Sequence, residues 1–244
     1  MDSKEKYTLM SKKVLEDVIL LKREMSTFLF SVSMWRKLLI EYKEREDKES
    51  LIHSNSRFAF FEHCCIALMR MWDGGEGSLS FFKIGEYLAK EEFIDFLNDD
   101  LMKRMKCLPE QAIDDTIKKR ERGFNEVRNI VEKYRRDRDI FLDVKKRNKN
   151  NNEEMIKELK ERNVLKMFIT VLLFRNKLYA HVDKGSFIDG LDYGYIGVDY
   201  FDEIKKDMSV MLEELSEIFG DGSSWSGESE ARMYDEDVKG IVIP

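Results

Sequence analysis

The chain has 244 residues, of which 37% are charged and 43% hydrophobic, with two prolines, three cysteines and a net charge of −6. This composition favours one or two domains built from long helices, and it argues against a β-rich fold. The cysteines form no CxxC pair, the start of the chain is charged, and the most apolar run, 164–174, is far shorter than the ~20 residues that span a bilayer. We therefore expect a cytoplasmic protein with no disulfide framework, no zinc cluster and no membrane partner.

Helical periodicity accounts for most of the first hundred residues. Apolar positions at steps of three and four predict one long amphipathic helix from Tyr7 to Glu46. A second helix, rich in aromatic residues and methionine, is predicted from Leu51 to Trp72 and ends at a glycine-rich loop. Ser80 is expected to cap a short helix from Phe81 to Ala89, and another helix is expected from Glu91 to Lys106.

The second half of the chain predicts three further helices and a tail. Pro109 suits the start of a helix that runs to about Arg147 and forms a basic arm at about 110–150. A helix from about Glu153 to His181 and a last helix from Asp199 to Phe219 complete an all-helical domain over residues 1–219. Residues 220–244 are acidic and rich in glycine and serine, so we expect a flexible tail or one that clasps another surface.

Charge is distributed unevenly along this chain. Residues 118–149 contain 13 Lys and Arg against 6 Asp and Glu, a net charge of +7, whereas residues 199–244 contain 4 against 13, a net charge of −9. A charged run of this kind usually forms a solvated helix face. Alternatively, arginines of the basic arm guide RNA phosphates by electrostatic attraction. The candidates for this RNA-binding role are Arg128, Arg135, Arg136 and Arg138.

Arg175 and His181 stand out because they follow the apolar run of a predicted helix. Arginine binds phosphate through a planar fork of donors, and histidine exchanges a proton near neutral pH. Six residues apart on an ideal helix, the two lie roughly 120° apart around the axis and about 9 Å apart along it. One copy of the chain would therefore hold them poorly, whereas two copies that meet across a two-fold axis could bring each Arg to the other's His. The alternative is a helix end with ordinary polar residues.

This segment resembles the active-site motif of the HEPN superfamily, an Arg commonly followed by Asn, then a His a few residues later. Here the motif is Arg175, Asn176 and His181, with Val182-Asp183-Lys184 after the histidine. That context, together with Leu68 to Asp73 followed by a Ser-Leu-Ser helix start, is similar to the abortive-infection, AbiU-like branch.

The resemblance implies an all-α fold, an elongated helical bundle with long antiparallel helices, that forms a homodimer and cleaves RNA without a metal or other cofactor. It implies that Arg175 binds the scissile phosphate, that His181 acts in acid–base catalysis and that Asn176 orients the site. Lys177 and Tyr179 would support positioning. An antitoxin or another regulatory protein is a possible further partner.

Two functions therefore follow from the sequence. The first is a metal-independent endoribonuclease that acts as a toxin or antiviral effector at a composite dimer site. The second is a non-catalytic helical dimer that binds RNA or a partner protein. The chain contains no GxSxG, HExxH or GxGxxG motif, and the glycine-rich loop after Trp72 lacks the Lys-Ser/Thr of a P-loop.

Overall fold

In the computed structural model, all regular secondary structure in the described residues is helical, and those residues contain no strand. The predicted all-α class is thus confirmed. None of the described helices combines the length and apolar character that crossing a membrane requires. The described residues are 2–44, 51–72, 80–148, 151–162, 164, 199, 201–219 and 226–239.

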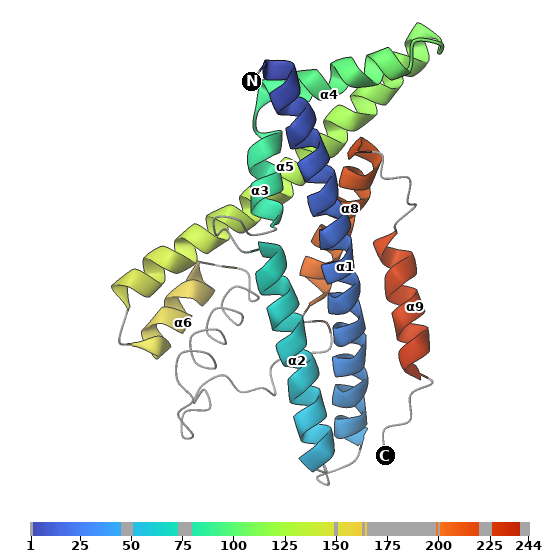
Figure 1. The fold of residues 1–244 in the computed structure, drawn as a ribbon. Helices are drawn as coiled ribbons and strands as arrows, with labels where there is room; N and C mark the ends of the chain where they lie inside the picture. The colour runs from blue at the N-terminus through green and yellow to red at the C-terminus, as the bar shows by residue number, and fades with distance from the viewer. Residues whose placement is uncertain are drawn as a thin grey trace.

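Eight helices are described in these ranges (Figure 1). Their boundaries lie close to those that the sequence predicts for most of the chain, because glycine and proline positions mark the ends. Ser80 caps its helix as expected, since its hydroxyl oxygen accepts a hydrogen bond from the Lys83 N–H at 3.3 Å. The helices are α1 (Ser3–Glu44), α2 (Leu51–Trp72), α3 (Phe81–Leu88), α4 (Glu91–Arg104), α5 (Glu110–Arg147), α6 (Asn152–Glu161), α8 (Asp202–Phe219) and α9 (Gly227–Lys239).

Helices α1 and α2 form the central hairpin, in which they lie side by side and run in opposite directions (Figure 1). The buried side of α1 repeats at alternating steps of four and three, which is the heptad spacing of helices that pack at a small angle. Each of these side chains is 5% exposed or less, so the stripe forms the spine of the core. The stripe consists of Val14, Val18, Leu21, Met25, Phe28, Val32, Trp35 and Leu39.

Helix α5 crosses this hairpin obliquely and packs against α3 and α8 (Figure 1). Two glycines allow the close approach. A Cβ at Gly85 of α3 would lie 2.6 Å from Cγ1 of Val131, and a Cβ at Gly123 of α5 would overlap a carboxylate oxygen of Glu214. At Gly85 the obstacle is the branched side chain of Val131, so a side chain there would push α3 and α5 apart, whereas at Gly123 it is the flexible end of Glu214, which can turn away.

Aromatic rings join α8 to the central hairpin. Phe201, immediately before α8, is fully buried, and its ring centroid lies 5.6 Å from that of Phe28, 5.4 Å from Trp35 and 5.8 Å from Phe61. The contacts with Phe28 and Trp35 are edge-on, a favoured geometry for aromatic pairs, and the ring of Phe61 is tilted by 41°. This cluster fixes the start of α8 against both α1 and α2.

The helix that the sequence predicts from about Glu153 to His181 ends at Glu161, which corrects that prediction, and residues 165–181 lie outside the described part of the chain. Helix α6 ends at Glu161, where the Arg162 N–H donates to the carbonyl of Glu158 and the Val164 N–H donates to that of Leu159. Such bonds satisfy the last carbonyls of a helix and turn the chain away from its axis. Val164 is buried, so burial of its side chain favours this turn.

The C-terminal region contains a helix where the sequence indicates a flexible or clasping tail. Helix α9 lies along α1 and also contacts α8 (Figure 1). Val238 is buried, and Ala231 and Tyr234 pack partly against the core. Their steps of three and four place them on one helix face, which explains why this short acidic segment is helical.

Candidate nucleic-acid interface

The residues of the candidate catalytic motif lie outside the described part of the chain. They are Arg175, Asn176, Lys177, Tyr179 and His181. The described residues that bear on RNA binding are the arginines of α5, and these occupy three different environments.

Arg128 binds the end of a neighbouring helix. Its Nε and Nη2 both donate to the carbonyl oxygen of Leu88, the former at 2.7 Å. Leu88 is the last residue of α3, and a carbonyl at that position has no partner within its own helix. A cation there also offsets the negative end of the helix dipole. Both donors of Arg128 therefore hold the end of α3 against α5.

Arg135 and Arg138 are also engaged by neighbouring side chains. Arg135 pairs with Glu132 at 3.5 Å and with Glu86 of α3 at 4.0 Å. Arg138 pairs with Asp139, and its guanidinium lies 4.5 Å from the centroid of the Phe82 ring. Both side chains are 30% exposed. A stacked and paired guanidinium contributes to packing, so only part of each is open to a phosphate.

Arg136 is the most exposed of the four. Its side chain is 66% exposed, although two of its nitrogens lie 3.2 Å from a carboxylate oxygen of Asp137. On an ideal helix it points about 100° away from Arg135. The four arginines thus do not form one continuous basic face.

We expect a substitution at Arg128 to lower mainly the stability of the fold, and one at Arg136 to weaken mainly the binding of RNA. Arg128→Met removes the charged hydrogen bonds to Leu88 and should lower the free energy of unfolding by about 1.5–3 kcal/mol. Arg136→Ala should change the melting temperature less. If RNA binds this arm, this substitution should also reduce the slope of log affinity against log salt concentration by about 1, the loss of one phosphate contact. Thermal unfolding and fluorescence anisotropy with a single-stranded RNA at several salt concentrations measure the two effects. A larger loss of RNA affinity with Arg128→Met, at unchanged stability, would contradict this assignment.

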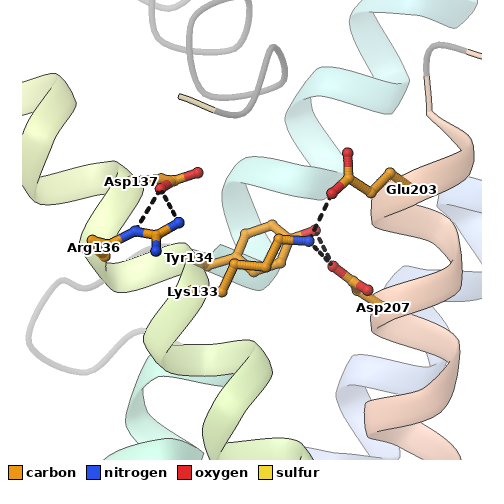
Figure 2. Close-up of polar contacts among 6 residues, drawn as sticks. All are labelled: Lys133, Tyr134, Arg136, Asp137, Glu203 and Asp207. Carbon is orange, nitrogen blue, oxygen red and sulfur yellow. Dashed lines mark hydrogen bonds and ion pairs between the residues drawn. The ribbon is translucent and has the colours of Figure 1, made fainter. Parts of the chain in front are cut away.

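A polar cluster that the sequence does not reveal joins α5 to α8 (Figure 2). The Lys133 ammonium donates to Glu203 at 2.7 Å and to Asp207 at 2.9 Å. The hydroxyl of Tyr134 donates to the same Asp207 carboxylate at 3.1 Å, and the Tyr134 ring stacks on Trp72 at 4.1 Å between centroids. One carboxylate therefore receives two donors from adjacent residues of α5.

This arrangement shifts the protonation equilibria of both α5 residues. Partial burial acts to lower the pKa of Lys133, but the hydrogen bonds to Glu203 and Asp207 outweigh it and raise that pKa above its ordinary value. Burial, and then the charge and hydrogen bond of Asp207, raise the pKa of Tyr134 far above its ordinary value of 10. At neutral pH the lysine is a cation and the tyrosine is neutral, so the cluster is an ion pair with an attached hydroxyl rather than a proton-transfer site.

Asp137 lies on the buried stripe of α5 and is 3% exposed. The stripe otherwise consists of apolar and aromatic side chains, and Asp137 lies three residues after Tyr134 and four before Phe141, where helical spacing places it on the same buried face. This departure is visible in the sequence, and it is the signal by which Asp137 could have been singled out. The apolar and aromatic members are Phe124, Val127, Val131, Tyr134, Phe141 and Val144.

Acidic residues of other helices neutralise much of the remaining charge of the basic arm. Lys119 pairs with Glu217 of α8 at 2.7 Å. Arg147 pairs with Glu158 of α6 at 2.7 Å, and Glu158 also forms an ion pair with Arg162. Helix α5 and the negative α8 thus pack on each other with opposite charges paired at Lys119 and Lys133.

Within the described residues, no group of three or more His, Cys, Asp and Glu side chains is placed to hold a metal ion. Cys64 and Cys65 are both buried, and burial is the main cause that raises the pKa of each thiol. They pack in the core of the hairpin.

Comparisons with known proteins leave the family open. No family model matches the chain, and neither curated proteins nor solved structures gave a match.

Proposed function

We propose that the chain is a metal-independent endoribonuclease of the HEPN type, a toxin or antiviral effector that cleaves RNA at a site shared by two copies. The observation that carries this proposal is the Arg175-Asn176 pair followed by His181. The helical character of the described residues supports it, since the HEPN resemblance implies an all-α fold with long antiparallel helices.

The chemistry follows from the properties of these side chains. Arg175 binds the phosphate between two nucleotides and offsets the charge that develops on it. His181 of one copy takes the proton from the 2′-hydroxyl that attacks the phosphorus, and His181 of the other gives a proton to the leaving 5′-oxygen. Asn176 and Lys177 hold the substrate in position, and Tyr179 orients Arg175. This reaction leaves a 2′,3′-cyclic phosphate and needs no metal.

A second function, a helical dimer that binds RNA or a protein without cleaving it, is favoured by a different observation. Arg128 is committed to Leu88 of α3, and Arg135 and Arg138 are paired within the fold. Structural use of these arginines leaves less positive surface for a long RNA, so within this second function a protein partner is favoured over RNA. In this case RNA affinity would be weak, would fall steeply with salt, and would produce no fragments.

One assay separates the two functions. The purified full-length protein is incubated with total RNA in excess EDTA, and the ends of any fragments are identified. The nuclease proposal predicts fragments with 2′,3′-cyclic phosphate or 3′-phosphate ends that form at the same rate with and without EDTA. Intact RNA after long incubation, or cleavage that EDTA abolishes, would count against a metal-independent enzyme.

A further inference from the structure

Four partly exposed rings, here named the ring row, form a line across three helices. Tyr234 of α9 meets Phe30 of α1 with centroids 6.0 Å apart, Phe30 meets Phe60 of α2 at 6.1 Å, and Phe60 meets His63 at 6.5 Å. Each contact is edge-on, at interplanar angles between 72° and 80°. His63 is exposed and the other three rings are half-buried, so the ring row lies at the surface where α9, α1 and α2 are side by side (Figure 1).

Two arginines extend the ring row along the α1–α2 hairpin. Arg23 precedes Phe30 by seven residues, and Arg70 follows His63 by seven, which places each arginine on the same helix face as the ring. Because the two helices are antiparallel, both arginines lie toward the same end of the hairpin. The ion pair between Arg70 and Glu24, at 3.5 Å, brings Arg70 next to the residue that follows Arg23.

The charges around the ring row favour the approach of an anion from one direction. Arg23 is exposed, and among the described residues it has no ion-pair partner. The Arg70 side chain is 65% exposed, and Glu24 offsets part of its charge. At the other end of the ring row, Glu230 and Asp235 of α9 accept hydrogen bonds from α1 and carry negative charge. A polyanion would therefore lie over α2 and the two arginines, away from α9.

Rings beside exposed guanidinium groups suit a single-stranded nucleic acid. The bases of a single strand stack on aromatic side chains, and its phosphates contact the cations beside them. A duplex keeps its bases stacked inside the helix, so the faces of those bases are closed to protein rings. The arginines of α5, by contrast, are largely engaged within the fold, and their arm offers no comparable row of partly exposed rings among the described residues.

We propose that the ring row, with Arg23 and Arg70, binds single-stranded RNA: bases stack on Phe60 and His63, and phosphates contact the two arginines. This inference rests on the proposed function, because it names the form of RNA that the nuclease takes, an unpaired strand and not a duplex. With two phosphate contacts, the log of the affinity should fall with the log of the salt concentration at a slope of roughly −1.4. Binding at this surface thus depends on stacking more than on charge.

Fluorescence anisotropy with a labelled single strand tests this surface in the full-length protein. The strand has a mixed sequence of about 12 nucleotides and carries 2′-O-methyl groups throughout, so attack by a 2′-hydroxyl cannot cleave it. Phe60→Leu and His63→Ala each remove a ring and should weaken binding by roughly 5- to 150-fold, the effect of one lost stacking partner. His63 is exposed, so its substitution should leave the fold intact.

Tyr87→Leu is the matched control, because it removes a half-buried ring from α3, outside the ring row. It should leave the affinity for the single strand within about twofold of the wild type. The same strand annealed to its complement should bind at least about tenfold more weakly, since its bases are closed to the rings. The melting temperature of each variant is measured beside its affinity.

The proposal is wrong if the wild type does not bind the single strand, if the duplex binds equally well, or if Phe60→Leu and His63→Ala bind as tightly as Tyr87→Leu. It is also wrong if these two substitutions separate a dimer in sedimentation without changing the RNA affinity, because the ring row would then join two copies. Cleavage of unmodified RNA is measured separately. Binding through the ring row without cleavage supports this surface and overturns the nuclease, whereas cleavage with binding unchanged by Phe60→Leu and His63→Ala does the reverse.

Discussion

His181→Ala is expected to lower the rate of RNA cleavage by about 10²- to 10⁴-fold, the contribution of a positioned acid or base. Arg175→Ala should have an effect of similar size because it removes the charge that binds the phosphate. Arg175→Lys should fall between wild type and Arg175→Ala, since lysine keeps the charge but loses the planar fork. The measurement is the initial rate of cleavage of a labelled RNA in EDTA, with the melting temperature of each variant beside it.

Arg104→Ala is the matched control for the loss of an arginine. Arg104 is 75% exposed and pairs with Asp100 one turn away on α4, so its removal should leave the cleavage rate within about twofold. The motif assignment is wrong if the double variant with Arg175→Ala and His181→Ala cleaves at the wild-type rate. It also fails if the active protein sediments as a monomer at the concentration of the assay, because on an ideal helix two side chains six residues apart would lie too far apart to act together.

The helices of this fold could be predicted from local signals. The end of α2 at Trp72 precedes a run of glycines, α5 begins after Pro109, and Ser80 caps α3. In each case one residue type restricts the backbone, so neighbours in sequence decide the boundary. The end of α6 at Glu161 was not predicted, because it depends on burial of Val164 in the core, and burial is a property of the assembled fold.

The partners of the basic arm could not be predicted, because they come from distant parts of the chain. Arg128 meets Leu88 forty residues earlier, and Lys133 meets Asp207 more than seventy residues later. The sequence indicates that positive and negative segments exist, but only the crossing of α5 with α3 and α8 determines which charges meet. An arginine that could bind RNA therefore cannot be distinguished in the sequence from one that binds a helix end.

The candidate catalytic motif shows the reverse situation. The side-chain chemistry of Arg175, Asn176 and His181 indicates the reaction, and the proposal uses no contact from the described residues. Its test is accordingly chemical, through RNA fragments and rates. The described contacts between α5 and α8 permit a different test, which measures stability directly.

Tyr134→Ala is expected to lower the free energy of unfolding by about 3–5 kcal/mol, the usual result of removing a large aromatic side chain from a core. Tyr134 is fully buried, stacks on Trp72 and donates to Asp207, so the substitution removes a ring, a stacking contact and a hydrogen bond together. For a chain of this size the melting temperature should fall by roughly 6–20 °C. Chemical denaturation at pH 8 and thermal unfolding measure the two quantities.

Tyr134→Phe isolates the hydroxyl. Its cost at pH 8 should be about 1 kcal/mol, because Asp207 keeps the Lys133 donor. The folded protein raises the pKa of Tyr134 above its ordinary value of 10, so the unfolded chain ionises first, and the stability of the wild type should fall as the pH rises above about 10. Tyr134→Phe cannot ionise there, and its disadvantage should shrink and then reverse. A cost that stays constant between pH 8 and pH 11 would show that this hydroxyl is not buried against Asp207.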